Sequence, residues 1–496
     1  MLESLGSAIS QFGNPIIWVY MIVGIWLGLI FGMLPGLGGM VALAVLMPFI
    51  YGMKPFLGLT FLIAAHSLIY TGGAVTAILF GIPPTPGEAA TVIDGFPLAA
   101  QGRGGEAVGA ALSASAVGGV YGAAILMICI WLLADAVLAF GAPEIFVVVC
   151  IGIFIISIIG RGSMLKGLIS GGLGMMIGLI GYSEVTGMPR ATFGWVEIYD
   201  GIPIIPLTLG LFAIPEMMAL AKGGTIAGEK QLKCSLRDVW RGAWAPFKYW
   251  YITLVTSVIG AVVGIIPGVG AETAPFVAYA WTKARSKHPE KFGTGMMEGV
   301  VAPETANNSK EGGALVPTLA LGIPGSSGMA ILLGAFWLVG VEPGPLFLKE
   351  HMDVAQGLIL TLVTANVLGA VLLMLVTNHL AKLCAVSSNI IVPIVLVLCC
   401  LGSYLAKGNL LHVFFLVPLG LLGYGLRALG YNRPAVVLGF VLASVAEKYF
   451  LIGQAAYGWT GFFTRPTAVI LILLFLLYVF YGHIKKFVVG MARGRA

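Results

Sequence analysis

Three stretches of the chain contain no Asp, Glu, Lys or Arg: residues 4–53, 55–87 and 312–341. A helix that crosses a membrane needs about 20 consecutive apolar residues, so each stretch is long enough to hold at least one. Over the whole chain only 10% of the residues are charged, whereas soluble domains carry about 25%. A soluble fold cannot cover its surface with so little charge, and the pattern therefore predicts an integral membrane protein.

Further apolar runs along the chain make the expected fold an all-α polytopic membrane protein. They lie at residues 106–134, 143–160, 163–182, 201–221, 249–266, 354–381, 383–406, 408–426, 434–452 and 466–482. Proline and glycine interrupt several apolar stretches. We therefore expect roughly 10 to 14 membrane segments, some of them broken or re-entrant.

The basic residues are distributed unevenly. Lys and Arg crowd residues 222–248 and residues 485–495, but the first 53 residues contain neither. Cytoplasmic segments of membrane proteins carry the excess of Lys and Arg. We therefore expect residues 222–248 and the C-terminus in the cytoplasm and the N-terminus on the outer side. The net charge of +6 has the same explanation and does not indicate nucleic-acid binding.

Two short motifs recur in the same order, which indicates an internal repeat. GMLPGLG at residues 32–38 returns as GIIPGVG at residues 264–270, an offset of 232. A second motif runs from Gly-Gly-Ala to Gly-Ile-Pro, at residues 72–83 and again at residues 312–324, with offsets of 240 and 241.

The repeat suggests how the chain is divided. We expect residues 1–221 to form a first membrane repeat and residues 222–248 a basic cytoplasmic linker. Residues 249–496 would then form a second repeat with additional C-terminal helices. Because the first half starts outside and the second starts at the cytoplasmic linker, the repeats have inverted topology, as in many secondary transporters. A different number of spans in the first half would make them parallel instead.

The Pro-Gly turns of the repeat point to a binding site at membrane depth. A broken helix in hydrocarbon leaves unpaired N–H and C=O groups that cost several kcal/mol each. A single break can be a simple kink, but four breaks paired across two halves favour a site that a bound solute or ion completes. At the first turn of each half we expect Gly36, Gly38, Gly268 and Gly270 to take part in ion coupling, with Na⁺ as the candidate ion.

The second break of each half offers hydroxyl groups and free backbone donors. In residues 81–88 Thr85 is placed to cap a following helix, and residues 322–328 supply Ser326 and Ser327 in a glycine-rich turn. Two helix N-termini aimed at one anion would hold a small carboxylate. We expect binding through backbone and hydroxyl donors rather than arginine side chains. The candidate substrate-binding residues here are Pro83, Thr85, Gly87, Gly325, Ser326 and Ser327.

A polar run at residues 302–309 precedes the third uncharged stretch. Asn307 and Asn308 are candidates to coordinate a hard cation or to bond the carboxylate, and Glu304 to hold Na⁺ or carry a proton. The alternative for Glu304 is a solvated turn before the next helix, and Asp94 faces the same choice. His66, inside an apolar run, is more typical of a buried, paired imidazole than of a metal ligand.

The sequence lacks the motifs of common enzyme classes. It contains no Walker A loop, Gly-x-Ser-x-Gly elbow or zinc signature, so no enzymatic activity is expected and no metal beyond a coupling Na⁺. A secondary carboxylate transporter fits these observations. A channel with re-entrant loops is the alternative, and it would conduct without coupling to a gradient. A membrane-embedded enzyme is disfavoured.

The motifs taken together resemble the large membrane subunit, TctA, of the bacterial tripartite tricarboxylate transporters. The resemblance is carried by both Gly-rich Pro-Gly turns, by DGFPLA at residues 94–99 with QGR at residues 101–103, by APE at residues 302–304 with Asn307-Asn308, and above all by LGIPGS at residues 321–326. It extends over most of the chain. Pro84 departs from it, because Gly commonly follows the first Ile-Pro, and this leaves the exact substrate open.

The resemblance implies a three-component system. This chain would work with a small, TctB-like membrane subunit and a periplasmic, TctC-like substrate-binding protein in the bacterial inner membrane, with the N-terminus in the periplasm. It also implies uptake of citrate or related carboxylates driven by an ion gradient. Paired broken helices are compatible with an elevator mechanism, in which one domain carries the site across a fixed scaffold.

Overall fold

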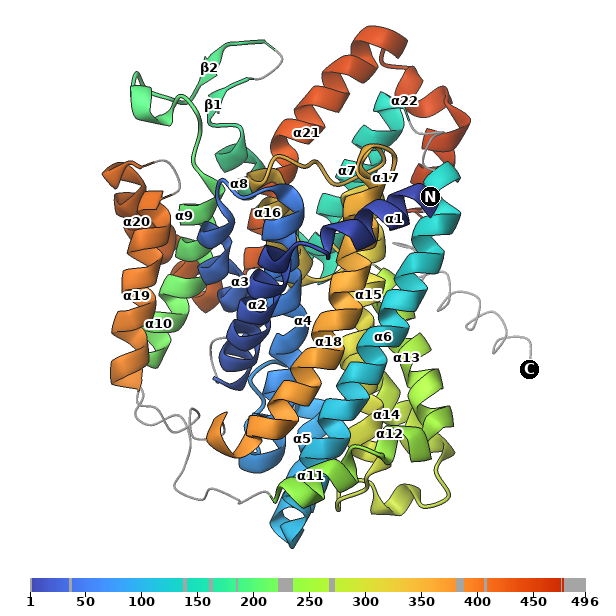
Figure 1. Cartoon of the computed structure of the whole chain (residues 1–496). Coiled ribbons are helices and arrows are strands. Elements are labelled where there is room, and N and C mark those ends of the chain that lie inside the picture. Colours follow the sequence, from blue (N-terminus) through green and yellow to red (C-terminus); the bar gives the residue numbers. More distant parts are fainter. Residues whose placement is uncertain are drawn as a thin grey trace, which may run out of the picture.

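The computed structural model describes residues 2–34, 38–136, 141–159, 164–183, 186–221, 235–266, 273–380, 388–405, 408–473 and 475–476. This part of the chain is almost wholly helical (Figure 1). Its strands, β1 (Gly181–Tyr182) and β2 (Pro189–Arg190), pair as a short antiparallel ribbon. The prediction of an all-α fold is confirmed.

The helices of the first half precede the basic segment. They are α1 (Leu2–Gln11), α2 (Pro15–Met33), α3 (Gly39–Leu46), α4 (Pro55–Phe80), α5 (Ala89–Leu98), α6 (Gly104–Ala136), α7 (Ala142–Ile159), α8 (Met164–Gly178), α9 (Ile204–Thr208) and α10 (Ile214–Leu220). Short 3₁₀ and π segments join some of them: η1 (Met47–Ile50), η2 (Ala99–Arg103), η4 (Val196–Ile198) and η5 (Leu209–Ala213).

The remaining helices lie in the end of the basic segment, which holds the first two, and in the second half. They are α11 (Leu236–Gly242), α12 (Ala245–Lys248), α13 (Trp250–Ile265), α14 (Ala274–Arg285), α15 (Glu298–Leu321), α16 (Ser327–Leu338), α17 (Phe347–Glu350), α18 (Met352–Leu380), α19 (Ser388–Leu405), α20 (Leu410–Ala428), α21 (Arg433–Tyr457) and α22 (Gly461–Thr464), with the 3₁₀ segment η7 (Pro289–Lys291) before α15.

Many of these helices are long and apolar enough to cross a membrane. Among the described residues six meet that test, or seven if the pair α11–α12 and α13, bent by 76°, counts as one broken span. Six shorter apolar helices of 10–17 residues accompany them. Short apolar helices beside a bent pair agree with the expected broken or re-entrant segments, and the chain is a multi-pass membrane protein.

Close packing of glycine joins the first two long helices of each half. A Cβ atom on Gly28 of α2 would lie 2.1 Å from the carbonyl oxygen of Ala65 in α4, and one on Gly260 of α13 would lie 2.5 Å from that of Ala306 in α15. Only glycine lets two helix backbones approach so closely. The sequence therefore builds the same tight helix pair twice.

The register of the two pairs is the same. Gly32 corresponds to Gly264 under the offset of 232 residues, and Ile69 corresponds to Lys310 under the offset of 241 residues. Gly32 packs on the carbonyl oxygen of Ile69 and Gly264 on that of Lys310, at 2.0 and 2.3 Å from an ideal Cβ. Gly72 and Gly313 also correspond at 241, since they pack on Leu29 and its counterpart Ala261. The offset of 240 expected for Gly-Gly-Ala is therefore one residue too small.

The long helices of both halves end in the same way. Gly81 after α4 and Gly322 after α15 adopt the left-handed conformation, with φ of 68° and 67°. Glycine takes up this conformation without steric cost and commonly terminates helices. Each helix is then followed by an Ile-Pro break and a shorter helix, α5 or α16.

The helices α4 and α15 cross antiparallel at the centre of the molecule. Asn308 of α15 bonds Thr71 of α4, and three residues later Glu311 pairs with His66, so numbers that rise on α15 fall on α4. Asn308 also approaches its own counterpart under the offset of 241: its amide nitrogen lies 3.4 Å from the Ser67 carbonyl oxygen. Two residues that correspond under the repeat offset are therefore in contact here. The orientation of each half in the membrane stays a prediction.

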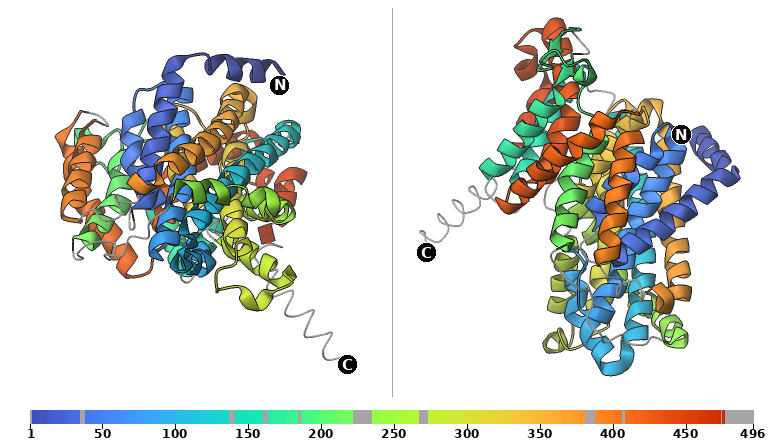
Figure 2. Two further views of the ribbon diagram at one scale, coloured as in Figure 1. Left: turned by 60° about the horizontal axis from the view of Figure 1, so that its bottom comes forward. Right: turned by 90° about the vertical axis from the view of Figure 1, so that its left-hand side faces the viewer.

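The remaining helices form two groups beside this central bundle. One group packs α7 and α8 against α21, and the other packs α9 and α10 with η5 against α19 and α20. Figure 2 shows the first group extending beyond one end of the bundle. The helices α16 and α3 lie against these groups, at α21 and at η5 respectively. Both groups thus combine helices from the two halves.

The structure bears on only part of the predicted basic linker. Residues 222–234 lie outside the described residues. The remainder forms α11 and α12, which pack on α6. A Cβ atom on Gly109 of α6 would lie 1.8 Å from the carbonyl oxygen of Val239, and Arg241 lies 3.3 Å from Glu106 of α6. The end of the linker is therefore an ordered helical layer on the start of α6.

Candidate functional site

A cavity of about 340 Å³ lies where the starts of α3 and α16 meet the break after α4. Sites for small molecules occupy about 300–1,000 Å³. A larger cavity of about 470 Å³, between α8, α21 and the β ribbon, is not lined by any of the helix breaks. The smaller cavity is lined by Gly38, Gly39, Met40, Val41, Tyr70, Pro84, Thr85, Pro86, Phe212, Glu216, Gly328, Arg427 and Arg433.

Helix N-termini contribute to the cavity wall from both halves. Gly38 and Gly39 begin α3, and Gly328 is in the first turn of α16. Ser326 caps α16, because its hydroxyl oxygen accepts the N–H of Met329 at 3.2 Å. The first turn of a helix carries unpaired N–H groups and a partial positive charge. Both repeats therefore present a favourable end to an anion.

Two arginines line the cavity, although the motifs favoured backbone and hydroxyl donors over arginine side chains as substrate ligands. That preference stays a prediction. Arg433 donates to the Leu211 carbonyl oxygen at 3.0 Å and lies 3.5 Å from Glu216, and Arg427 donates to Glu216 at 2.9 Å. Two guanidinium groups sharing one carboxylate leave a net positive charge. Arg427 and Arg433 lie more than 100 residues from the repeated motifs, so the motifs gave no signal for them.

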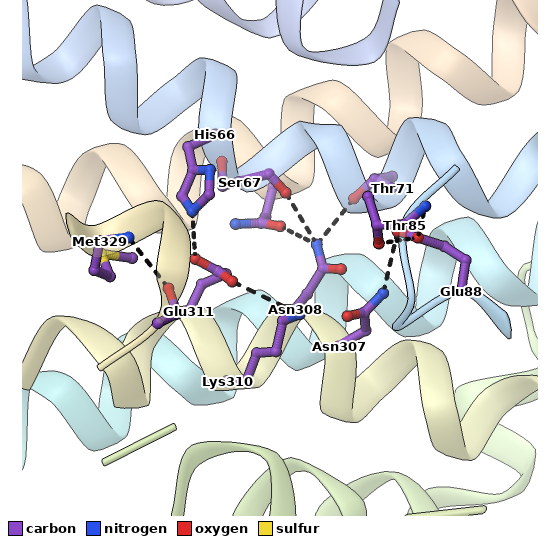
Figure 3. Close-up of polar contacts among 12 residues, drawn as sticks. His66, Ser67, Thr71, Thr85, Glu88, Asn307, Asn308, Lys310, Glu311 and Met329 are labelled. Atoms are coloured by element: carbon purple, nitrogen blue, oxygen red, sulfur yellow. Dashed lines mark hydrogen bonds and ion pairs between the residues drawn. The ribbon is translucent and has the colours of Figure 1, made fainter. Parts of the chain in front are cut away.

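The break after α4 is held by Glu88. Its carboxylate accepts the Thr85 N–H at 2.9 Å and the Thr85 hydroxyl, as Figure 3 shows. The N–H contact is the back-reaching half of a capping box. The structure corrects the expected role of Thr85, because its hydroxyl donates to Glu88 and does not cap α5 by accepting an N–H.

Behind the cavity wall lies a buried group of charges at the crossing of α4 and α15. His66 Nε2 lies 2.9 Å from Glu311 Oε2, and both side chains are 2% exposed. Lys310, fully buried, has its Nζ 4.0 Å from Glu311 and 3.9 Å from the centroid of the Tyr70 ring. Tyr70 also lines the cavity, so one aromatic ring separates the cavity from the ammonium group.

Asn308 connects three helices at this crossing. Its amide nitrogen donates to Thr71 of α4 at 2.9 Å and to Asn366 of α18 at 2.7 Å (Figure 3). Asn307, one residue earlier, donates to Glu88 at 3.5 Å. The polar run at residues 302–309 is therefore not a solvated turn, because it lies inside α15 and is buried throughout.

Glu304 and Asp94 are both buried and both paired. Thr91 and Ser115 donate to the two carboxylate oxygens of Glu304 at 2.5 and 2.9 Å. Asp94 accepts the Tyr279 hydroxyl and the N–H groups of Gly293, Gly295 and Met296. Glu304 thus faces the polar interior, whereas Asp94 fastens the segment before α15 to α5 and α14.

The structure brings only some of the predicted site residues together. Thr85 and Gly38 line the cavity, and Gly87, Asn307, Asn308 and Glu304 lie in the polar layer behind it. Pro83 is exposed, and Gly325 packs with an ideal Cβ only 2.5 Å from Ala314. Ser326 acts as a cap and Ser327 is half-buried beside it. Gly36, Gly268 and Gly270 lie outside the described residues. The functional roles of all these residues stay predictions.

Fold and site together define a polytopic helical membrane protein built on a duplicated unit of broken helices, with a cationic cavity beside them. The profile of one family matches most of the chain, residues 18–438: the tripartite tricarboxylate transporter TctA family. The chain belongs to this family, which makes it a large subunit of the tripartite tricarboxylate transporter type and not a member of an enzyme family.

Two proteins of Agrobacterium vitis are similar to the chain. One, described as an uncharacterized 52.8 kDa protein in the TAR-I ttuC' 3' region, is 31% identical over 88% of this chain and 86% of its own length. The other, described as an uncharacterized protein in the TAR-II ttuC' 3' region, is 32% identical over 44% of this chain and 92% of its own length. No solved structure matches the chain.

Proposed function

We propose that this chain is the translocating subunit of a binding-protein-dependent secondary transporter that imports tricarboxylates or related di- and monocarboxylates, coupled to a Na⁺ or H⁺ gradient. The family supplies the transporter class. The cavity supports the substrate class, because it joins two arginines with helix N-termini from both halves. Guanidinium groups bind carboxylates through paired, charge-assisted hydrogen bonds, and a cavity with net positive charge favours a multiply charged anion.

The orientation in the membrane is part of the proposal. The helices α11, α12 and α14 lie toward the end of the bundle where α6 begins (Figure 1). Exposed basic side chains are concentrated on these helices and on the segments next to them: Arg103, Arg237, Arg241, Lys248, Lys283, Arg285, Lys287 and Lys291. The positive-inside rule assigns this end to the cytoplasm. We therefore propose an inner-membrane protein with a periplasmic N-terminus and a cytoplasmic C-terminus.

The proposed partners are a small TctB-like membrane subunit and a periplasmic TctC-like binding protein that delivers the carboxylate. We propose that the two halves are inverted repeats and that their broken helices carry the substrate in an elevator movement. The separation of a central bundle from two outer helix groups supports this mechanism. Structures of two states in which the cavity stays at one depth would exclude it.

The proposed function is tested by uptake into proteoliposomes that contain this chain, the small subunit and the binding protein. A panel of labelled mono-, di- and tricarboxylates is offered with and without Na⁺ and pH gradients. We expect gradient-dependent accumulation of at least one carboxylate. Equilibration without accumulation, under every gradient, would contradict secondary transport and favour a channel.

A further inference from the structure

The polar interior at the crossing of α4 and α15 carries more negative than positive charge. The ionisable side chains are Glu88, Glu304, Glu311, Lys310 and His66, and none is more than 2% exposed. Three carboxylates and one ammonium sum to −2, or to −1 if the imidazole is protonated. Burial of an uncompensated charge costs several kcal/mol. A cation that binds here would lower this cost.

Glu88 and Glu304 are in no ion pair among the described residues. Glu311 already has His66 and Lys310 as cationic partners. Among the described residues, Glu88 is hydrogen-bonded to Thr85 and Asn307, and Glu304 to Thr91 and Ser115. All of these partners are neutral. Glu304 and Asn307 are three residues apart on α15 and so lie on one face of the helix. Asn307 thus contacts one of these carboxylates, Glu88, and lies about one helical turn from the other, Glu304.

Asn307 adds an atom that needs a partner. The side chain is fully buried, and its Oδ1 has no hydrogen-bond donor among the described residues. A buried amide oxygen without a partner costs about 1–3 kcal/mol. The atom lies against Gly87, 2.8 Å from the position of an ideal Cβ there. A side chain at position 87 would collide with it, so glycine keeps the approach to this oxygen open.

The internal repeat relates this place to the cavity. Under the repeat offset of 241 residues, His66 corresponds to Asn307 and Gly87 corresponds to Gly328. Gly328 packs on the His66 ring, 2.5 Å from an ideal Cβ, as Gly87 packs on Asn307. In each half a glycine after the break thus covers a polar side chain of the other half's long helix. The two equivalent places differ in their neighbours, since His66 pairs with Glu311 beside the arginine-lined cavity, whereas Asn307 contacts Glu88.

We propose that Glu88, Asn307 and Glu304 form a binding site for a sodium ion, the counterpart of the anion cavity under the internal repeat. The available ligands are carboxylate, amide and hydroxyl oxygens, which hard cations prefer. A sodium ion can compensate charge and also take Asn307 Oδ1 as a ligand. The inference rests on the proposed function only in giving this ion the coupling role; binding itself can be measured without transport.

The test measures thermal unfolding of the purified full-length chain in detergent, without substrate. NaCl is titrated against KCl and choline chloride at constant ionic strength and at several pH values. A ligand that binds the native state alone raises Tm as its concentration passes Kd. We expect a saturable rise in Tm with Na⁺, and no equal rise with K⁺ or choline. Equal Tm in the three salts, or stabilisation by acid alone, overturns the proposal.

Variants locate the site. Asn307→Ala should raise the half-saturating Na⁺ concentration about tenfold or more, because a ligand atom is lost, and Glu88→Gln and Glu304→Gln should abolish the response. Asn307→Ser, a milder change, should shift it in the same direction if the alanine variant fails to fold. Glu106→Gln, which changes an acid in surface ion pairs with Arg103 and Arg241, should keep the wild-type response. An unchanged response in all the site variants overturns the assignment.

Discussion

At the scale of single residues, Arg433 is the side chain whose role follows most directly from its surroundings. It is 13% exposed, lines the cavity and shares Glu216 with Arg427. A substrate carboxylate has the same chemistry as Glu216, so it can take up the same donors. Under the proposed function, the arginines would keep Glu216 as their partner while the cavity holds no anion and would exchange it for the substrate.

We therefore predict that Arg433→Gln raises the half-saturating substrate concentration by about tenfold or more, since charged hydrogen bonds contribute about 1.5–3 kcal/mol. Arg433→Lys should recover only part of the affinity, because an ammonium cannot form the paired contacts of a guanidinium. Uptake kinetics in proteoliposomes give the measurement. Arg190→Gln, which breaks an ion pair with Glu447 away from the cavity, is the matched control and should transport normally. Wild-type kinetics for Arg433→Gln would remove it from the site.

Asn308 has a structural role in addition to its predicted contact with the substrate. We predict that Asn308→Ala lowers uptake and also destabilises the protein by about 1–3 kcal/mol, because Thr71 and Asn366 lose a buried donor. Ser326→Ala should cost about 1 kcal/mol through loss of the α16 cap. Thermal unfolding and uptake are measured together. An Asn308→Ala protein with wild-type stability but no uptake would instead indicate direct substrate contact.

The residues that the sequence predicted and those that it missed differ in one physical respect. Thr85, Asn307 and Glu304 lie in or beside polar or helix-breaking motifs that interrupt apolar stretches. Such motifs are unusual in a membrane segment and can be recognised from the sequence alone. Arg427 and Arg433 lie at ordinary helix ends, where basic residues are common. Their approach to the cavity depends on how the outer helix groups dock, which no local pattern encodes.

At the scale of elements, the glycine contacts between α2 and α4 explain why the repeat is visible in the sequence at all. The two halves share few side chains, but both need glycine wherever backbone meets backbone. The sequence therefore predicted the order of motifs and the helix breaks. It left a solvated turn open as the alternative for Glu304 in the polar run of α15. The sequence could not exclude that turn, because the polar groups are paired with residues of α4, α5 and α6, which are distant in sequence.

We predict that Gly28→Ala destabilises the protein by about 1–3 kcal/mol or prevents folding, because the new methyl group would lie 2.1 Å from a carbonyl oxygen. Gly260→Ala, the equivalent change in α13 with 2.5 Å of space, should act in the same direction. Gly172→Ala in α8 has no atom within 4 Å of the new Cβ and should be neutral or slightly stabilising. Thermal unfolding in detergent compares the three. Equal Tm values for Gly28→Ala and Gly172→Ala would show that the helix pair tolerates separation.

At the scale of the whole molecule, the two halves and their charges make a prediction about sidedness. The helices α4 and α15 cross antiparallel, so their starts lie at opposite ends of the bundle. Lys54 precedes α4 and Lys287 lies before α15, and both are exposed. If the halves are inverted repeats with the basic end in the cytoplasm, these two positions face opposite sides of the membrane.

We predict that a single cysteine at position 54 reacts with a membrane-impermeant maleimide added to intact cells from the periplasmic side, and that one at position 287 reacts only after the inner membrane is opened. The background is a chain whose six native cysteines are replaced, with uptake as the check that each variant is folded. The physical reason is the positive-inside rule, which holds the basic segments around position 287 in the cytoplasm. Labelling of both positions from one side would contradict inverted repeats. Labelling of position 287 from the periplasm and of position 54 only after opening would agree with inverted repeats but overturn their proposed orientation.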